Sequence, residues 1–576
     1  MRSHGEPGSN LIDHATGGDT LRRRVLVCAG LALLFFAAIA PTLTWQDFSN
    51  GSENLNVATV LEMLRDGGRI KLLPTLQHRP RTNKPPLTAW ITAAVVPQSA
   101  VEGVSSRDPA TRDAAARAVA WRVRIIALLA GCGMIVATYL LAELLAGPTV
   151  GLIAALVCGT TLMFLRQTRL GTTDIQLALW VAIANVFIAR ALLRGVTWTN
   201  CIGAGLALAL AIMSKGPVGL VQTLAPALAW FAWARWTRDP AQRGTARMRY
   251  LPIVLGLSLM LVVGSAWFVY VLLHTSGGMM SGWMREVTRE GATTLRESDW
   301  YNYALMFPGM FPWCVFFVVG LILAWRELKG RRREPLLLSL FLLLVPILVM
   351  SLFRDRKERY LLPMTPAEAI VIAWGVREHL RGWATWSRAD TITTGIHWLL
   401  LLVVAVALPV AGTLGVQGMR AVDGGPWFAP ALGWSAAAVL GVVIVSATIV
   451  HRRWKGGLVA GTVIVMLLLQ AIAMWGYTRS TEGTSQMKIF ADAIWLAAPD
   501  AQVVNAASNR TTAPSDLSIY LNRAIETKPV PVPDGKPIVV LIYQRLRDPE
   551  PTPPERFAPI AKVGEGRTTW HAFAAK

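Results

Sequence analysis

The sequence has few charged residues for its length, and its cysteines are few and scattered. Only 16% of the 576 residues are Asp, Glu, Lys or Arg, against roughly a quarter in ordinary soluble domains. The five cysteines all lie inside apolar runs, with no CxxC pair and no spacing suited to a metal ion. These absences argue against a soluble enzyme, a disulfide-stabilised domain and a zinc site.

Motifs for nucleic-acid binding are also absent, although the formal net charge is +21. No zinc-finger, helix-turn-helix or RNA-binding signature accompanies the Lys and Arg residues. Most of them lie in short segments between apolar runs, where they set the orientation of a membrane protein. We therefore expect no nucleic acid among the partners.

Long apolar runs are abundant and decide the fold class. About 20 apolar residues span a bilayer as a helix, and the runs predict an α-helical polytopic membrane protein with about thirteen transmembrane helices. An odd number of spans places the two termini on opposite sides of the membrane. The predicted spans are residues 25–45, 120–145, 150–166, 174–193, 199–213, 217–235, 252–273, 306–326, 335–352, 362–380, 395–415, 429–450 and 457–477.

Lys and Arg in the connecting segments predict the orientation, because they favour the cytoplasmic side. If the N-terminus is cytoplasmic, the basic segment His451–Lys455 also falls inside, as do Arg377, Arg381 and Arg388. The start of the chain, Arg22–Arg24 followed by an apolar run, resembles a signal sequence, which we interpret as a retained anchor. The C-terminal segment then lies outside.

Two segments outside the membrane have patterns of their own. In the C-terminal segment, a β-like run at 537–543 and an amphipathic stretch at 487–496 predict a small α/β domain. The first outer loop has apolar residues at helical spacing over 53–64, and a short apolar stretch at 86–96 suits a helix lying along the membrane surface. The predicted parts are a cytoplasmic tail at 1–24, a transmembrane domain at 25–477 that includes the outer loop 46–119, and an outer domain at 478–576.

Several cations fall on the outer face, where the charge rule disfavours them. Lys84 precedes the predicted surface helix, and Lys215 lies between two adjoining spans. Arg166 and Arg169 stand in one outer loop, and Arg359 stands in another. Because positive charge there opposes insertion, it needs a compensating use, and Lys and Arg bind phosphate through charge-assisted hydrogen bonds. Ion pairs with carboxylates or lipid headgroups explain any single cation equally well. The set together favours a phosphate site.

Carboxylates on the same face are few, and they are the candidate catalytic groups. Asp174 stands where an outer loop enters a span, and acids are costly at that depth unless they have a function. A carboxylate can take a proton from an acceptor hydroxyl or amine within hydrogen-bond reach. Glu53 opens a helix, where its alternative role is to interact favourably with the helix dipole.

Six short motifs follow one another along the predicted outer face. They are Ser52–Asn56, Glu62–Leu64, Lys84–Leu87, Arg169–Asp174, Ser214–Gly219 and Lys357–Pro363. In this order they resemble the motifs of the polyprenyl-phosphate-dependent glycosyltransferases of type C fold, the group of the protein O-mannosyltransferases and the lipid A aminoarabinose transferases. The resemblance covers roughly residues 20–380, and thirteen spans with an outer C-terminal domain are similar to the aminoarabinose transferase branch.

The resemblance implies a membrane glycosyltransferase that moves a sugar from an undecaprenyl-phosphate-type donor to a lipid A-like or other envelope acceptor. It places the reaction at the periplasmic face of the bacterial inner membrane, with the polyprenyl-phosphate-linked sugar, a lipid, glycan or protein acceptor and membrane lipids as partners. Lys84, Lys215, Tyr360 and Arg359 would hold the lipid phosphate. Asp174, with an acid of the first loop, would position the acceptor or act as base.

Two departures from the family pattern leave alternatives open. Ser52 replaces the first acid of the family's acidic pair, so either Glu53 takes its role, or the register is displaced and Asp47 does, or the protein is a non-catalytic relative that binds lipid phosphate. Asn83 stands where some aminoarabinose transferases carry a glutamate proposed as a metal ligand. A divalent metal is compatible with the family, but the sequence contains no ligand cluster for one.

A transporter or flippase is the remaining alternative class. Thirteen spans and outer cations also suit a translocation path, which inverted repeats and interrupted helices would favour. The sequence shows neither feature clearly. The long outer loop at 46–119 and its predicted surface helix favour an enzyme.

Overall fold

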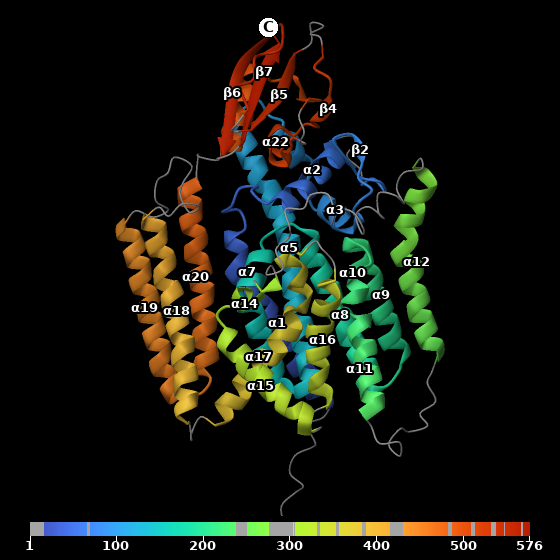
Figure 1. Ribbon diagram of the computed structural model, residues 1–576, viewed down its shortest axis with the longest axis vertical. Helices are drawn as coiled ribbons and strands as arrows, with labels where there is room; N and C mark the ends of the chain where they lie inside the picture. Colours follow the sequence, from blue (N-terminus) through green and yellow to red (C-terminus); the bar gives the residue numbers. More distant parts are fainter. Residues whose placement is uncertain are drawn as a thin grey trace, which may run out of the picture.

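The computed structural model places a bundle of long helices beneath a smaller domain that contains a β-sheet (Figure 1). The chain returns to this smaller domain at its C-terminus, which lies at the end remote from the bundle. The structure describes residues 17–65, 70–237, 250–275, 303–304, 306–330, 334–352, 356–382, 387–414, 430–481, 486–508, 513–531, 537–545, 548–565 and 568–575.

Each of the thirteen predicted spans overlaps a helix of the bundle. Seven of the described helices are long and apolar enough to cross a membrane, and three further apolar helices are shorter. The protein is therefore a multi-pass membrane protein, and the number of thirteen crossings stays a prediction. The helices of the bundle, long and short, are α1 (Gly17–Ile39), α5 (Pro109–Ala146), α6 (Pro148–Thr160), α8 (Thr173–Arg194), α9 (Trp198–Lys215), α11 (Leu224–Thr237), α12 (Tyr250–His274), α15 (Cys314–Gly330), α16 (Glu334–Met350), α17 (Thr365–Arg381), α18 (Arg388–Leu414), α19 (Pro430–Arg453) and α20 (Gly457–Thr481).

Short elements connect these helices at their ends. The two helices expected in the first outer loop are present as α2 and α3, since apolar residues at helical spacing give each one face to bury. The short elements are η1 (Ala40–Thr42), α2 (Gly51–Arg65), β1 (Thr75–Leu76), β2 (Arg79–Pro80), α3 (Leu87–Ala93), α4 (Gln98–Val104), α7 (Leu162–Gln167), α10 (Val218–Val221), α14 (Met306–Gly309) and η4 (Glu358–Met364).

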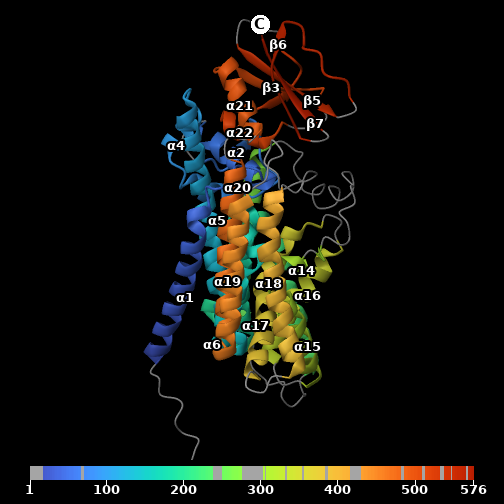
Figure 2. The ribbon, with the colours of Figure 1, turned by 90° about the vertical axis from the view of Figure 1, so that its left-hand side faces the viewer.

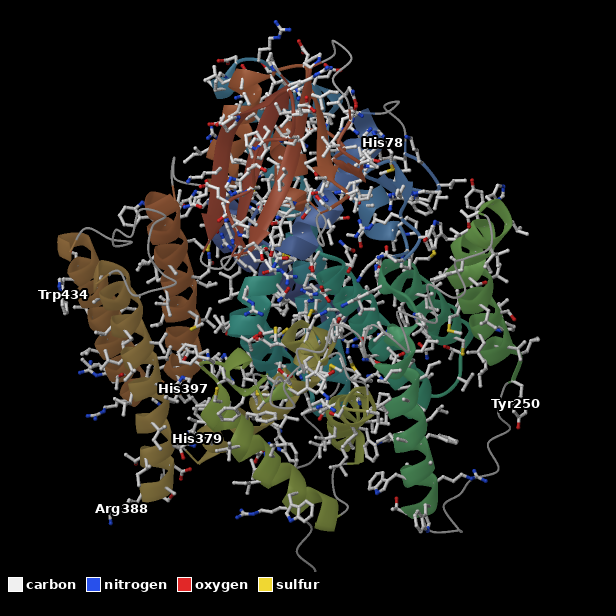
Figure 3. The ribbon with its side chains drawn as sticks, turned by 45° about the horizontal axis from the view of Figure 1, so that its top comes forward. His78, Tyr250, His379, Arg388, His397 and Trp434 are labelled. Carbon is white, nitrogen blue, oxygen red and sulfur yellow. The ribbon has the colours of Figure 1, made fainter. Side chains whose placement is uncertain are left out.

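The outer faces of the bundle are apolar, as a bilayer requires. Val262 and Leu273 on α12 and Val442 on α19 are largely exposed although they are aliphatic. Tyr250 on α12 and Trp434 on α19 are exposed aromatics on opposite flanks of the bundle (Figure 3). Such side chains are stable where lipid, and not water, surrounds the helices.

Buried polar side chains join three helices inside the bundle. His379 of α17 hydrogen-bonds with the hydroxyl of Thr394 on α18 at 2.8 Å, and His397 of α18 with that of Thr462 on α20 at 2.9 Å. Figure 3 shows the two histidines close to each other in this part of the bundle. Because an unpaired polar group inside a membrane is costly, these contacts fix how α17, α18 and α20 pack.

The C-terminal domain contains a five-stranded mixed sheet with the order β4-β3-β5-β7-β6. Strand β3 runs parallel to β4 and β5, whereas β7 is antiparallel to both β5 and β6. The predicted small α/β domain is thereby confirmed, including the helix and strand expected at 487–496 and 537–543. Its elements are α21 (Gln486–Ala497), β3 (Gln502–Ala506), α22 (Ser515–Leu521), β4 (Glu526–Lys528), β5 (Ile538–Arg545), β6 (Phe557–Glu565) and β7 (Thr568–Ala575).

The first outer loop and the C-terminal domain share one hydrophobic core. The cluster joins Val57 of α2 and Val119 of α5 to Phe490 of α21, Leu517 of α22 and Val539 of β5. Figures 1 and 2 show the sheet, α21 and α22 seated on α2 and α4 at the same end of the bundle. The two outer segments, more than 350 residues apart in sequence, therefore pack as a single cap on the bundle.

Candidate functional site

A cluster of charged and aromatic side chains forms at the end of the bundle that faces α2 and the C-terminal domain. Asp174 is buried and forms an ion pair with Lys215, while Nε of Arg359 lies 3.8 Å from its other carboxylate oxygen. The Lys215 ammonium lies 4.4 Å from the centre of the Tyr360 ring. Four of the predicted site residues thus lie together, and their roles stay predictions.

Each member of the cluster stands at the end of an element, which explains how they meet. Asp174 occupies the first turn of α8, where a carboxylate interacts favourably with the helix dipole. Lys215 is the last residue of α9, which ends at Gly216 with a positive φ of 87°. Tyr360 belongs to η4, and its carbonyl accepts a hydrogen bond from the side chain of Gln222 at 3.2 Å.

A cavity of about 740 Å³ opens beside this cluster. One part of its wall is apolar and includes Leu162, Met466 and Leu469, and another part carries the cations Arg169 and Arg359. An apolar wall with a basic rim suits an amphiphile that has an anionic head group. The cavity also receives polar residues from the loop before α2 and from η4, namely Gln46, Ser49, Asn50, Lys357 and Glu358.

Arg169 is a buried cation on the cavity wall that has no carboxylate partner among the described residues. Only 6% of it is exposed, and its guanidinium donates to the hydroxyl and the carbonyl of Thr42. Its Nε has no hydrogen-bond partner in the described part of the chain. Burial, and to a lesser extent the charge of Arg124, lower the pKa of Arg169 to about 9. Such an uncompensated cation favours an anion in the cavity.

Arg166 and Arg359 of the same rim do have acidic neighbours. Arg166 pairs with Glu358 at 2.8 Å, and both side chains are partly exposed. Arg359 stands next to the Asp174 carboxylate. The rim is therefore a network in which carboxylates already balance some of the cations, and Arg169 is the buried member that they leave uncompensated.

Glu53 lies inside the structure, where its carboxylate is fully engaged. It is bound at both oxygens by Arg124, with N–O distances of 2.8 Å, and Oε1 also accepts the backbone N–H of Gly171 at 2.9 Å. The side chains of Glu53 and Arg124 are both buried. Its predicted catalytic role stays a prediction.

Asp47 lies in the loop between η1 and α2, and its backbone carbonyl accepts a bond from Arg124 at 3.2 Å. Burial raises the pKa of the Asp47 carboxyl, and the charges of Lys488 and Arg124 oppose this shift in part. A carboxylate with a raised pKa is a better proton acceptor. Asp47 nevertheless lies outside the lining of the 740 Å³ cavity, which its neighbour Gln46 does join.

Lys84 lies at the base of the surface segment that leads into α3. It lines a small recess together with Asn56 and Thr173, the residue before Asp174. The structure therefore brings the predicted Lys84 motif to the start of α8, beside the charged cluster.

Asn83, at the position of the family's proposed metal-ligand glutamate, is exposed. Among the described residues, no three His, Cys, Asp or Glu side chains gather as metal ligands.

Arg124 was not among the predicted site residues, and Arg169 was predicted only as one of the outer-face cations that together favour a phosphate site. Arg124 stands near the start of the predicted span 120–145, and an arginine inside an apolar run is a costly residue that points to a fixed partner. That signal was available in the sequence, but the identity of the partner was not. Arg169 belongs to a motif that resembles the family, yet its burial without a counter-charge depends on the fold.

Comparison with known proteins places this geometry in context. Residues 116–270 match the family described as dolichyl-phosphate-mannose-protein mannosyltransferase. The crystal structure of ArnT from Cupriavidus metallidurans bound to undecaprenyl phosphate superposes with a TM-score of 0.69 at 17% identity, covering 97% of this chain and 98% of that one. At this identity the likeness shows the fold.

Two relatives match over part of the sequence. The undecaprenyl phosphate-alpha-4-amino-4-deoxy-L-arabinose arabinosyl transferase of Pseudomonas aeruginosa is 24% identical over 266 residues, which is 45% of this chain and 46% of the relative. A protein of Aquifex aeolicus is 22% identical over 355 residues, 61% of this chain and 64% of its own length. The matched regions thus span about half to two thirds of these relatives.

Fold and site together define a polytopic membrane protein with the architecture of the type C glycosyltransferases. The resemblance to the polyprenyl-phosphate-dependent members of that group, expected from the six motifs, is confirmed. The chain is similar in fold to ArnT, and residues 116–270 are similar to the protein mannosyltransferases.

Proposed function

We propose that the protein transfers a sugar from a polyprenyl-phosphate donor to a lipid or other envelope acceptor at the outer face of a bacterial inner membrane. The observation that carries this proposal is the Asp174–Lys215–Arg359–Tyr360 cluster next to the amphipathic cavity. Arg359 lines the cavity, and the other three residues stand behind it. The ArnT neighbour holds undecaprenyl phosphate, and the Pseudomonas relative is named for a donor built on it. Both support a lipid phosphate as the ligand.

The proposed chemistry is a single displacement at the anomeric carbon of the donor sugar. The acceptor oxygen or nitrogen attacks this carbon, the bond from the carbon to the phosphate oxygen breaks, and polyprenyl phosphate leaves with the electron pair. The acceptor loses one proton, which a carboxylate takes. Lys215 and Arg359 would stabilise the negative charge that grows on the phosphate, and the apolar wall would hold the prenyl chain.

Asp174 is our preferred carboxylate for positioning the acceptor or taking its proton. In the structure, Lys215 neutralises it. If a donor phosphate binds to Lys215, the ammonium is shared between the two anions, and the Asp174 carboxylate is freer to hydrogen-bond to the acceptor. The same contact would then hold the leaving group and free the base. Asp47, whose pKa is raised by burial, is the second proposed acid of the site.

The test is release of polyprenyl phosphate by the purified protein in detergent or nanodiscs. Undecaprenyl-phosphate-linked sugars would be supplied with lipid and glycan acceptors, and wild type compared with Asp174→Asn, Lys215→Ala and Asp47→Asn. We expect Asp174→Asn to lower kcat by roughly 10²–10⁴-fold if it is the base. Lys215→Ala should raise the KM for the donor and lower kcat.

Arg107→Gln supplies a control, because Arg107 is an exposed, ion-paired cation that does not line the cavity. We expect it to change kcat and KM by only a few fold, as for other exposed ion pairs. No release of polyprenyl phosphate by the wild type with any donor would contradict the proposal. Binding of the lipid without turnover would instead indicate the non-catalytic relative, which the serine at position 52 makes a real outcome.

A further inference from the structure

Both carboxylate oxygens of the buried Glu53 accept hydrogen bonds from the protein. Oε1 receives Nε of Arg124 and the N–H of Gly171, and Oε2 receives Nη2 of Arg124. Like Asp174, the glutamate is buried and stands outside the cavity lining, but Arg124 binds both of its oxygens. A general base must reach the proton that it removes, and this carboxylate faces protein on both oxygens.

Two side chains of α2 bind the backbone of Gly171, one at its N–H and one at its carbonyl. Its N–H binds Glu53, and its carbonyl accepts the side-chain amide of Asn56 at 3.0 Å. A Cβ at position 171 would stand 2.1 Å from Cγ1 of Val123, so only glycine fits against α5 here. The next residue, Thr172, is the N-cap of α8, and Asp174 follows in the first turn. The place of Gly171 therefore sets the place of Asp174.

Arg124 extends the same contact to the loop that carries Asp47. Its remaining N–H groups donate to the carbonyls of Leu43, at 2.8 Å, and of Gln46 and Asp47. Gln46 lines the cavity. One ion pair thus joins the start of α2, the loop before it and the loop that begins α8.

We propose that Glu53 is a positioning residue, and that with Arg124 it fixes the two loops that carry Asp47 and Asp174 relative to each other. The inference rests on the proposed glycosyltransferase function, because it assigns these carboxylates to one site. Glu53 acts on the reaction through Gly171 and not on the substrate. A small displacement of a catalytic group lowers the rate steeply, so an ion pair that fixes two loops has a direct effect on kcat.

Two substitutions of Glu53 separate a positioning role from that of a base. Glu53→Gln keeps the length of the side chain and an oxygen that can accept the Gly171 N–H, but it cannot take up a proton. Glu53→Asp keeps the acid and shortens the side chain away from Gly171. If Glu53 positions, Glu53→Gln retains more kcat than Glu53→Asp, and the pH profile of kcat keeps its shape. A lower kcat in Glu53→Gln than in Glu53→Asp would overturn the proposal. So would a pH profile of kcat that loses its acidic limb in Glu53→Gln.

A second pair of variants tests the geometry without removing a charge, in case Glu53→Gln leaves Arg124 unpaired and the protein does not fold. Gly171→Ala should lower kcat by roughly 10-fold or more with little change in the donor KM, since the added Cβ collides with Val123 and displaces the loop. Val123→Ala makes room for it. The double variant Gly171→Ala/Val123→Ala should regain most of the lost kcat, with Val123→Ala alone as the control.

Failure of this inference and failure of the proposed function give different results. A wild-type protein that releases no polyprenyl phosphate removes the function itself. An active wild type in which Gly171→Ala keeps full activity, or in which Val123→Ala brings no recovery, removes the positioning role and leaves the function in place. Far-UV circular dichroism and monodispersity in detergent confirm that each variant is folded.

Discussion

At the scale of single residues, the charges in this protein differ in whether the fold supplies a partner. Glu53 and Arg124 satisfy each other, and Asp174 is balanced by Lys215. Arg169, in contrast, is buried with only the hydroxyl and carbonyl oxygens of Thr42 as acceptors. Because isolated buried charge is costly, Arg169 is the residue at which a bound anion would have the largest effect.

Replacement of Arg169 should therefore weaken binding of a phosphate-bearing lipid. We expect undecaprenyl phosphate to raise the apparent Tm of the wild type, because a ligand that binds the folded state stabilises it. Arg169→Gln should bind roughly 10-fold or more weakly, as loss of a hydrogen bond to a charged group implies. The thermal shift is measured against lipid concentration, with undecaprenol, which lacks phosphate, as the ligand control. Equal affinity of Arg169→Gln and wild type would contradict this role.

Asp47 gives a prediction about pH. Burial raises the pKa of its carboxyl, so the folded protein binds the proton more tightly than the unfolded chain does. The contribution of Asp47 to stability is then most favourable below its unfolded pKa and declines as pH rises through the folded pKa. Asp47→Asn should raise the apparent Tm at pH 8, and the difference from wild type should shrink toward pH 4. A lower Tm than wild type at pH 8 would show that Lys488 and Arg124 outweigh burial.

At the scale of elements, the start of α5 joins the C-terminal domain to the bundle. Arg112 of α5 pairs with Asp492 of α21 at 2.6 Å and lies over the ring of Trp495 at 5.2 Å. The neighbouring pair of Lys488 and Asp113 has a separation of 2.7 Å. Because α5 continues from this contact into the bundle, one helix carries both Arg112 at the cap and Arg124 beside the site.

The buried arginine at this contact should matter more than an exposed one nearby. Arg112 is itself buried and also donates to the carbonyls of Ser106 and Arg107, so Arg112→Ala removes these partly buried hydrogen bonds together with the ion pair and should cost about 1–3 kcal/mol. Arg107 pairs with Asp500 at the surface, and Arg107→Ala should change stability by about 0.5 kcal/mol or less. Thermal or denaturant unfolding in detergent measures both. Equal effects would show that burial at Arg112 is not decisive.

At the scale of the whole molecule, the outer loop and the C-terminal domain form one packed unit. Their shared core joins α2 and α5 to α21, α22 and the sheet, although the two segments stand at opposite ends of the sequence. Removal of the C-terminal domain would expose the apolar face of α2. Glu53 belongs to the same helix. The domain is therefore expected to stabilise the site even though it contributes no residue to the charged cluster.

Two leucines of the C-terminal domain test this shared core. Leu517 of α22 is fully buried in it, whereas Leu496 of α21 is 89% exposed. Leu517→Ala should lower stability by about 2–5 kcal/mol through loss of buried contacts and the cavity left behind. Leu496→Ala should stay within about 0.5 kcal/mol of wild type. If Leu517→Ala reduces both the apparent Tm and kcat, the cap supports the site; an unchanged Tm would contradict the shared core.

Much of the architecture could be predicted from the sequence because it depends on local pattern. Apolar runs predict the helices of the bundle, and short β-like runs with the amphipathic stretch at 487–496 predict the C-terminal domain. The motifs also predict that Asp174, Lys215, Arg359 and Tyr360 share one face, and the structure brings these four together. The exact ends of spans and the number of crossings are less determined by pattern, since several helices are shorter than a bilayer needs.

By itself, the sequence determined the membrane class, the helices, the small C-terminal α/β domain and the family resemblance, because hydropathy and short motifs are properties of neighbouring residues. Only the tertiary structure decided which charge meets which. Glu53 and Arg124 are 71 positions apart, and Asp174 and Lys215 are 41 apart, so no local pattern pairs them. Whether a carboxylate is locked in an ion pair or faces a cavity depends on packing between distant helices, and so does the burial of Arg169 without a counter-charge.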